Sequence, residues 1–470
     1  MRSLAKELRA IVGDRAVKER PSELTVFHSD GLPTHEATPG LAVLPSTREE
    51  TVGIVKLLHH RGVPFVARGA GTGLSGGALA QEDAVLIVLT RLNRIKRIDP
   101  VSRRAVVEPG VVNAKLGEAV AGHGLQYAPD PSSQAACTIG GNVAENAGGP
   151  HCLKYGTTTN HIVALEVVLP DGSQASFGSP HGEPWGPDLV GLFVGSEGMF
   201  GIATEITLRL VPLPTAIRTL LAAFASIRAA SEAVSDIIAS GVVPAALEMM
   251  DGPCIRAVEE SIYACGYPTD AAAVLLVELD GHSEGVAGEE RSVTAILRHH
   301  GATEVRRAET ATERAQLWQG RKKAFGAMGR VTRDLIVQDA VVPRSSLPDV
   351  LDRIGVIADE SQLRVVNVFH AGDGNLHPNI CYDRRDPGEV LRVQSASRAI
   401  MQTCVDAGGS ITGEHGVGSD KIGFMEMIFD ADTLAAMCDV RRVFDPSGRA
   451  NPGKVVPIHA CREWRAGGVE

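Results

Sequence analysis

The chain has 470 residues, of which 44% are hydrophobic and only 4% aromatic, and its formal net charge is −10. This length exceeds what a single hydrophobic core usually holds, so we expect at least two domains. The acidic balance and the scarcity of aromatic side chains argue against nucleic acid as a partner, and the longest apolar runs are strand-sized, too short for a transmembrane segment.

The eight cysteines lack the close spacing that iron–sulfur clusters and structural zinc sites require. Any iron–sulfur cluster that the protein uses must therefore sit on another polypeptide. The first residues alternate charged and apolar side chains and contain no signal-peptide core. We therefore expect a cytoplasmic protein.

The first half of the chain alternates strand patterns, helix patterns and glycine-rich turns. Strands are predicted at residues 42–45, 63–68, 84–89, 95–98, 105–107, 162–170 and 202–210. Ser46, with Glu49 three residues later, predicts the start of a helix that runs to about His60, and a second helix is expected over 113–123. This mixture indicates an α+β domain.

Five glycines fall within residues 69–77, and Gly71, Gly73 and Gly76 fit the G-x-G-x-x-G pattern of Rossmann folds. That pattern requires a helix directly after the glycines, whereas residues 84–89 predict a strand. We therefore reject a Rossmann site. The backbone of such a loop can approach a diphosphate closely and donate several N–H groups to it; the alternative is an ordinary surface loop.

Residues 129–156 are dense in glycine, serine, threonine and asparagine. Side chains of this kind cannot build a hydrophobic core, but they can wrap a polar, extended ligand. Pro212 and Pro214 then mark a domain boundary. Beyond it, two β-α-β units and a helix at about 313–328 predict a second α+β domain, with an antiparallel sheet and helices on one face.

His370 and His377 flank a turn-forming cluster, residues 372–375, which follows a strand pattern at 364–369. Because the chain doubles back there, both imidazoles can reach one point. Glu414, in a second glycine-bracketed loop, supplies a carboxylate. Three such ligands suit a divalent metal, zinc, manganese or iron, with coordination positions left open. The alternative is that these are ordinary polar turn residues.

Several of these motifs resemble the flavin-binding domain of the vanillyl-alcohol-oxidase (PCMH-type) family. They are residues 68–73, 129–133, 138–142, 146–149 and 195–198. Residues 370–377 and 413–416 resemble the D-2-hydroxyacid dehydrogenase branch of that family, which contains glycolate oxidases, D-lactate dehydrogenases and D-2-hydroxyglutarate dehydrogenases. The resemblance covers about residues 20–457, with the motifs in the same order.

The resemblance implies a two-subdomain, PCMH-type FAD-binding domain over residues 1–214. It further implies an α+β cap domain with an antiparallel sheet over 215–430, which carries the metal site, and a C-terminal segment, 431–470, that returns to the FAD domain.

The resemblance also implies non-covalently bound FAD, because the glycine loop contains neither histidine nor cysteine; His151 and Cys152 are the residues that would allow a covalent link. The residues that it places against FAD are Arg68, Gly69, Gly71, Thr72, Gly73, Leu74, Ser75, Pro131, Ser133, Thr138, Gly140, Gly141, Asn142, Asn146, Gly149, Gly156, Glu197, Ile202 and Asn451. Lys454 is expected near the flavin ring or in structural packing.

The implied reaction is oxidation of a small D-2-hydroxy acid to the 2-oxo acid, with metal-assisted removal of the hydroxyl proton and hydride transfer to flavin N5. His415 is the expected base. Arg321 is expected to bind the substrate carboxylate, although a solvated basic helix face is the alternative, and Asn379 is expected to assist. Glycolate or D-lactate is the favoured substrate.

Three alternatives remain open: a D-2-hydroxyglutarate-type dehydrogenase, a non-redox flavoprotein resembling ether-lipid synthases, and a non-catalytic flavin subunit. Phe325 and Val337 stand where the hydroxyglutarate branch has a threonine and a lysine, which argues against a second substrate carboxylate. The possible partners are a second flavin subunit and an iron–sulfur subunit as electron acceptor, with a quinone or a cytochrome as alternative acceptors. A membrane reached through a partner and a second copy of the chain are also possible.

Overall fold

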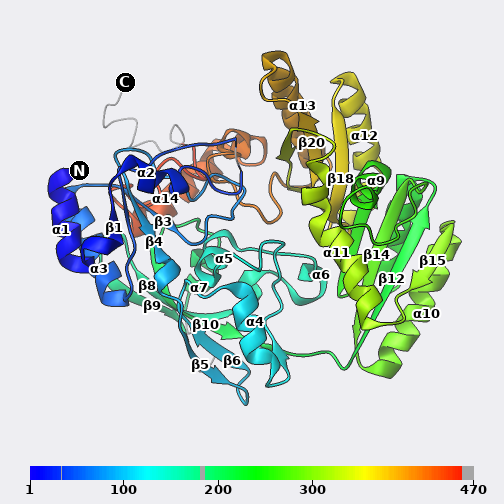
Figure 1. The fold of residues 1–470 in the computed structure, drawn as a ribbon, viewed down its shortest axis with the longest axis horizontal. Helices are drawn as coiled ribbons and strands as arrows, with labels where there is room; N and C mark the ends of the chain where they lie inside the picture. Colours follow the sequence, from blue (N-terminus) through cyan, green and yellow to red (C-terminus); the bar gives the residue numbers. More distant parts are fainter. Residues whose placement is uncertain (33, 180–185, 458–470) are drawn as a thin grey trace. The chain divides into compact units, whose positions relative to one another are not determined.

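The computed structural model describes residues 1–32, 34–179 and 186–457, and the chain divides into two compact units (Figure 1). The first unit holds residues 1–148, 156–213 and the chain from 414 onward; the second holds residues 149–155 and 214–413. The first boundary thus falls one residue before the predicted one. The chain returns to the first unit at Glu414 rather than at 431, and residues 149–155 belong to the second unit.

The first unit contains a small sheet of strand order β1-β2-β4-β3. Its strands are β1 (Val17–Lys18), β2 (Leu41–Val43), β4 (Val85–Val88) and β3 (Phe65–Arg68). β2, β4 and β3 run parallel. β4 is buried at every position, as its unbroken apolar sequence predicts for a parallel strand covered on both faces.

Helix α3 (Arg48–Arg61) connects β2 to β3. Its N-cap is Thr47, whose side chain accepts the Glu50 amide at 3.1 Å. The predicted cap, Ser46, instead donates its own amide to the Glu50 carboxylate at 2.6 Å. The helix ends at Gly62, which takes a left-handed φ of 67° that favours glycine.

The larger sheet of the first unit has the order β5-β6-β10-β8-β9, with antiparallel neighbours throughout. Its strands are β5 (Ile95–Asp99), β6 (Arg104–Val107), β10 (Ile202–Arg209), β8 (Ile162–Val168) and β9 (Gln174–Gly178). The apolar core on this sheet includes residues of α4 (Asn113–Ala121), α5 (Ile139–Glu145) and α14 (Ala431–Phe444). Phe444 stacks on Phe200 with ring centroids 4.4 Å apart, which fixes α14 in this unit.

The second unit is built on one nine-stranded sheet in which every pairing is antiparallel, as predicted. Its main order is β15 (Glu304–Arg307), β12 (Ala216–Phe224), β14 (Ala273–Gly281), β13 (Ala246–Asp251), β18 (Arg364–His370), β19 (Asn375–Leu376) and β17 (Ala340–Val341). β20 (Pro378–Tyr382) pairs with β18, and β16 (Asp334–Val337) pairs with β20.

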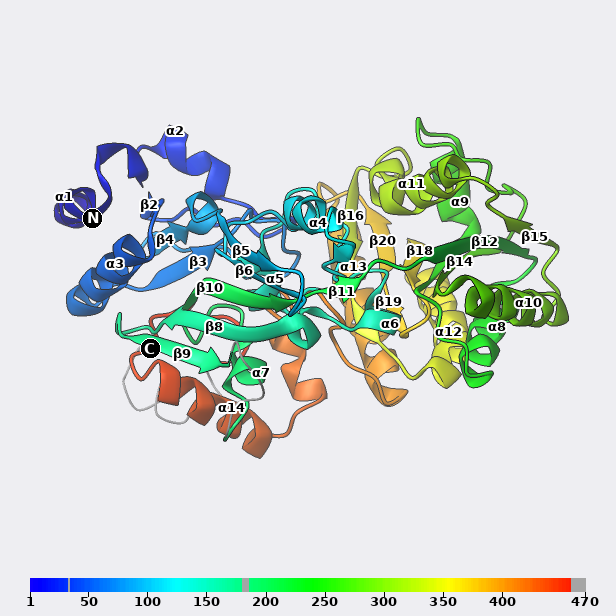
Figure 2. The ribbon, with the colours of Figure 1, turned by 90° about the horizontal axis from the view of Figure 1, so that it is seen from below.

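Helices cover both faces of this sheet, so the expectation of helices on one face is wrong (Figure 2). α9 (Gly252–Glu259) and α11 (Ala311–Met328) lie on one face; α8 (Ile227–Ala239), α10 (Ser283–His299) and α12 (Leu347–Glu360) lie on the other. Val274 and Leu276 of β14 pack with residues of α9 and α11, and β14 is buried from Ala273 to Asp280. A strand covered on both faces reads as a continuous apolar run.

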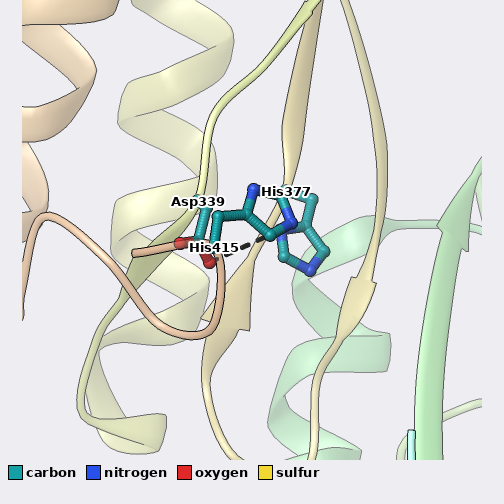
Figure 3. A group of neighbouring side chains, drawn as sticks. All are labelled: Asp339, His377 and His415. Carbon is teal, nitrogen blue, oxygen red and sulfur yellow. Dashed lines mark ion pairs between the residues drawn. The ribbon is translucent and has the colours of Figure 1, made fainter. Parts of the chain in front are cut away.

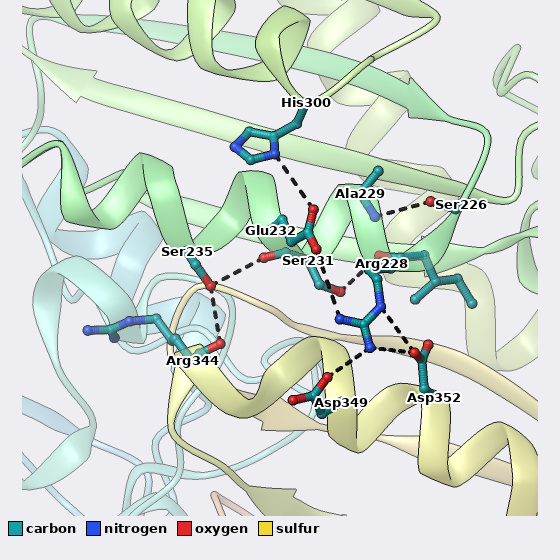
Figure 4. A network of polar contacts seen from close by, with 11 residues as sticks. Ser226, Arg228, Ala229, Ser231, Glu232, Ser235, His300, Arg344, Asp349 and Asp352 are labelled. Carbon is teal, nitrogen blue, oxygen red and sulfur yellow. Dashed lines mark hydrogen bonds and ion pairs between the residues drawn. The ribbon is translucent and has the colours of Figure 1, made fainter.

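Polar contacts join α8 and α12, which lie side by side (Figure 4). Arg228, near the start of α8, reaches Asp349 at 2.8 Å and Asp352 at 2.5 Å on α12. Hydrogen bonds to these carboxylates raise the pKa of Arg228. Because such pairs are solvent-exposed, we expect the sheet core and not these pairs to stabilise the unit. In the part of the chain that is described, no helix has both the length and the apolar character to cross a bilayer.

Because the sheet of the second unit is buried on both faces, we expect two leucine substitutions to change the free energy of unfolding by clearly different amounts. Leu276 is fully buried in β14, so Leu276→Ala should lower the free energy of unfolding by about 2–5 kcal/mol through lost burial and a residual cavity. Leu391, on α13 (Pro387–Asp406), is 64% exposed, and Leu391→Ala should change it by less than about 0.5 kcal/mol. Urea denaturation of both variants measures the difference. Equal changes in the free energy of unfolding would contradict a sheet that is buried on both faces.

Candidate flavin site and metal centre

The glycine loop, residues 69–77, leaves β3 and leads to β4 without an intervening helix, as predicted. Gly71 has a φ of 72°, and a Cβ there would collide with the Arg68 guanidinium. At Gly73 a Cβ would meet nothing within 4 Å. The loop therefore combines a position that only glycine fits with bare backbone beside open space, which suits the close approach of a polar ligand.

The start of α5 lies against this loop. A Cβ at Gly69 would collide with Thr138 Oγ1, and Thr138 caps α5 by accepting the Gly141 amide at 3.4 Å. Asn142, one turn into α5, is buried, and its Nδ2 has no hydrogen-bond partner among the described residues. A buried donor left unpaired by the protein is what a site for a polar cofactor would show.

Asn451 joins the same region from the far end of the chain. Its Nδ2 donates to the carbonyl of Gly77 at 3.1 Å and to that of Glu197. Lys454, which follows in the same turn, donates to the Leu79 carbonyl at 2.9 Å. The first unit thus brings together four predicted segments that are distant in sequence, and their arrangement fits FAD.

Some residues assigned to FAD by resemblance already have protein partners. Arg68 donates to the carbonyls of Ser29 and Ala78 at 2.8 and 3.3 Å. Asn146 is the left-handed C-cap of α5 and accepts the Thr159 amide at 2.9 Å. These side chains hold neighbouring backbone segments of the first unit in place, and their contact with FAD stays a prediction.

The Glu197 carboxylate accepts the amides of Val417 and Gly418, each at 2.7 Å. Burial raises the pKa of Glu197 to about 7, partly offset by these amides. Burial and the neighbouring Glu197 raise the pKa of Glu145 well above its ordinary value. Through its two hydrogen bonds, Glu197 therefore fixes residues 417–418, which follow the Glu414 loop, within the first unit.

The remaining predicted FAD residues occupy backbone turns and strand starts. The Thr72 and Gly73 carbonyls lie against Gly31, as does the Leu74 side chain, and the Ser75 carbonyl accepts the amides of Ser419 and Asp420. Pro131 and Ser133 form the turn before Thr138, Gly140 packs on Pro109, and Ile202 opens β10 in the core. Gly149 and Gly156 both have positive φ. Gly149 begins the short segment 149–155 that belongs to the second unit, and Gly156 follows that segment directly.

Within residues 149–155, His151 contacts two residues of the second unit, Glu278 and Trp318. Its Nε2 lies 3.3 Å from Glu278 Oε1, and its ring stacks on Trp318 at a centroid distance of 5.9 Å. Trp318 Nε1 donates to the other Glu278 oxygen at 2.6 Å. Cys152 follows His151 directly and begins the short helix α6 (Cys152–Tyr155). Non-covalent attachment of FAD stays a prediction.

The strand–turn–strand that carries the two predicted histidine ligands is present in the second unit. His370 ends β18 and pairs with Asn375 of β19. Gly374 has a φ of 78°, and a Cβ there would collide with the Val342 carbonyl, so the reversal requires glycine. The rings of His370 and His377 are buried and meet edge to face, with centroids 5.2 Å apart.

Asp339, which the sequence reasoning did not assign to the site, holds the second loop. Its Oδ2 accepts the Thr412 hydroxyl at 2.7 Å and the Gly413 amide at 3.0 Å. A Cβ at Gly413 would collide with the Asn375 side chain. Residues of the second unit therefore fix the loop as far as Gly413. The boundary between the two units falls directly after Gly413.

Glu414 and His415, the next two residues, complete two overlapping groups of candidate ligands. The ligand atoms of His370, His377 and Glu414 all lie within 4.8 Å of one another. Those of Asp339, His377 and His415 meet the same limit (Figure 3). The three predicted metal ligands are thus brought together, and two imidazoles with a carboxylate form a donor set that fits zinc, manganese or iron.

Glu248 of β13 contacts His370, the first of these candidate ligands. Its Oε1 and Oε2 lie 2.8 and 3.0 Å from His370 Nδ1, and Arg321 Nη2 lies 2.6 Å from Oε2. Burial raises the pKa of Glu248, but the charges and hydrogen bonds of Arg321 and His370 outweigh it, and the net shift is downward.

The other two predicted catalytic residues lie in the same unit. Arg321 is 2% exposed on α11, so the alternative of a solvated basic face is wrong for this residue. Asn379, on β20, donates through Nδ2 to the carbonyls of Val366 and His377 at 2.9 and 2.6 Å. Its Oδ1 has no hydrogen-bond partner in the described part of the chain. Substrate contact by either residue stays a prediction.

Comparison with known proteins agrees with this arrangement. Residues 39–178 match a family model described as an FAD binding domain, and residues 213–455 match one described as the C-terminal domain of FAD linked oxidases. Glycolate oxidase subunit GlcD of Escherichia coli K12 is 48% identical over 465 residues, which cover 99% of this chain and 93% of that protein. D-lactate dehydrogenase of Anaerostipes hadrus is 32% identical, covering 89% of this chain and 90% of that protein.

Among solved structures, p-cresol methylhydroxylase with bound substrate aligns with a TM-score of 0.81 over 96% of each chain at 18% identity. At that identity the match shows the fold alone, and it confirms the expected PCMH-type architecture. The two family models and the high identity over nearly the whole length carry the assignment further: the chain belongs to the FAD-linked oxidases, in their D-2-hydroxyacid dehydrogenase branch.

Proposed function

We propose that this protein oxidises a small D-2-hydroxy acid, glycolate or D-lactate, to the corresponding 2-oxo acid with FAD as the hydride acceptor. The observation that carries the proposal is the convergence of His370, His377 and Glu414, which come from two loops far apart in the sequence. The names of the relatives, a glycolate oxidase subunit and a D-lactate dehydrogenase, agree with this substrate class.

Each residue of the candidate site has a separate role in the proposed reaction. His370, His377 and Glu414 would hold a divalent cation, which would supply Lewis acidity that lowers the free-energy cost of losing the hydroxyl proton by several kcal/mol. His415, beside His377 in the cluster, accepts that proton, because an imidazole has an ordinary pKa of about 6.5 and works best as a base near neutral pH. Arg321 binds the substrate carboxylate and fixes the orientation of the α-carbon.

The two positions at which the chain departs from the hydroxyglutarate branch favour a short substrate with one carboxylate. Phe325 packs with an apolar cluster of the second unit, and Val337 ends β16. Neither side chain can hold a second carboxylate. This supports glycolate or D-lactate over D-2-hydroxyglutarate, and the assembled histidine and carboxylate cluster argues against a non-redox or non-catalytic flavoprotein.

We further propose that the electrons leave through a partner, a second flavin subunit or an iron–sulfur subunit. The GlcD relative is named as a subunit, and the cysteines of this chain are too widely spaced in the sequence to match an iron–sulfur motif. A cytoplasmic location, with any membrane contact made through that partner, fits this arrangement.

Anaerobic mixing of the FAD-loaded protein with candidate substrates tests the proposed function. After mixing, glycolate or D-lactate should bleach the visible absorbance of the flavin, because hydride transfer reduces the flavin. L-lactate and D-2-hydroxyglutarate serve as controls and should bleach it far more slowly. A flavin that stays oxidised with every hydroxy acid in the panel would refute the proposal.

Two histidine variants should fail for different reasons. His415→Ala should keep FAD and lower kcat by roughly 10²- to 10⁴-fold, because it removes the base. His370→Ala should keep FAD but lose the metal. His300→Ala, on the far side of the sheet beside Asp236, is the matched control and should leave both unchanged. Flavin absorbance, elemental analysis and turnover are measured together; wild-type turnover in either site variant would overturn its assignment.

Removal of the metal should inactivate the enzyme reversibly. Dialysis against a chelator is expected to abolish flavin reduction by D-hydroxy acid while FAD stays bound, since the two sites use different residues. Zn²⁺ or Mn²⁺ should restore it. Full activity in a preparation shown by elemental analysis to contain no metal would contradict a role for the cation.

A further inference from the structure

We propose that Glu248 is a positioning residue that holds both the candidate metal ligand His370 and the candidate carboxylate-binding Arg321 in their working orientations. This inference rests on the proposed function and deepens it. It assigns one buried carboxylate to two tasks, ligand orientation and substrate orientation.

The sheet register places Glu248 against His370. In the antiparallel pairing of β13 with β18, Glu248 lies directly opposite His370, and residues paired in this way point to the same face with Cβ atoms about 5 Å apart. Both carboxylate oxygens lie within hydrogen-bond distance of His370 Nδ1, at 2.8 and 3.0 Å. Nδ1 therefore donates its proton to Glu248, and Nε2 is the ring nitrogen that carries the lone pair a cation needs.

Arg321 approaches the same carboxylate from α11, through Nη2 at 2.6 Å from Oε2. A guanidinium is planar, so one fixed edge sets the direction of its other donors. Arg321 Nε is buried and has no hydrogen-bond partner among the residues described. A buried donor held in place and left unpaired is available to a ligand carboxylate.

The competing explanation is that Glu248, His370 and Arg321 form a buried ionic cluster that serves only folding. The two explanations differ in what Glu248→Gln does. An amide has the size of the carboxylate but only one acceptor oxygen. Because both carboxylate positions lie within hydrogen-bond distance of His370 Nδ1, the NH₂ group of the glutamine would lie beside this donor in either orientation. The substitution therefore disturbs the contact with His370 without a change in side-chain volume.

The matched control is Asp251→Asn. Asp251 lies on the same strand, is also buried, and accepts the Cys254 amide at 2.9 Å and the Asn367 amide at 2.7 Å. These contacts involve none of the candidate ligands. The control thus exchanges a buried carboxylate of β13 for an amide while leaving His370 and Arg321 with their partner.

Binding of Mn²⁺ to metal-depleted, FAD-loaded protein is measured by electron paramagnetic resonance, which counts free Mn²⁺ and needs no turnover. Glu248→Gln should weaken Mn²⁺ binding by roughly 10- to 100-fold, the usual effect of losing the partner of a ligating histidine. Asp251→Asn should stay within about twofold of the wild type, since it shares no partner with the site. Unchanged affinity in Glu248→Gln, or an equal loss in Asp251→Asn, would overturn the proposal.

If Glu248→Gln does not fold, Glu248→Asp tests the positioning role of Glu248. It keeps the charge but withdraws it by one methylene from both partners, so Mn²⁺ binding should weaken and KM for the hydroxy acid should rise. Wild-type values of both would overturn the proposal. Failure of the proposed function looks different: the wild type would bind Mn²⁺, and Glu248→Gln would weaken that binding, yet no hydroxy acid would reduce the flavin.

Discussion

The hydrogen bonds that Asp339 accepts from Thr412 and Gly413 are the constraint on which the candidate metal centre depends. The two histidines come from one strand–turn–strand, but the carboxylate and the proposed base come from a loop some forty residues later. Asp339 anchors that loop directly before Glu414, and the close packing of Gly413 on Asn375 leaves it little freedom. These contacts among the protein's own residues bring the loop of Glu414 to the two candidate histidine ligands.

The buried sheet of the second unit explains how so much charge is tolerated beside the site. Removing an unpaired charge from water costs several kcal/mol, and the buried carboxylates of this sheet are paired accordingly. Glu248 meets His370 and Arg321, and Glu278 accepts hydrogen bonds from Trp318 and Thr219 at 2.6 and 2.9 Å. Helices on both faces keep water away from these pairs, which strengthens each contact and fixes its geometry.

Much of this arrangement was predictable because it rests on local patterns. The strand predicted after the glycine loop excluded a Rossmann site, and glycine at position 374 marked the reversal between the histidines. Interactions that depend on tertiary packing were not predictable. Asp339 and Glu248 carry no local signal, since their roles arise from partners 73 and 122 residues away. Helix α5 was missed because its two glycines are poor helix formers, and the cap of α3 moved by one residue because serine and threonine are adjacent there.

The proposed reaction depends on one ion shared by His370, His377 and Glu414. Anomalous diffraction from a crystal of the Mn²⁺- or Zn²⁺-loaded protein tests this sharing, because the peak locates the metal without reference to activity. We expect a single strong peak about 2.0–2.2 Å from one ring nitrogen of each histidine and from a Glu414 oxygen. A peak elsewhere, or coordination that leaves out either histidine, would contradict it.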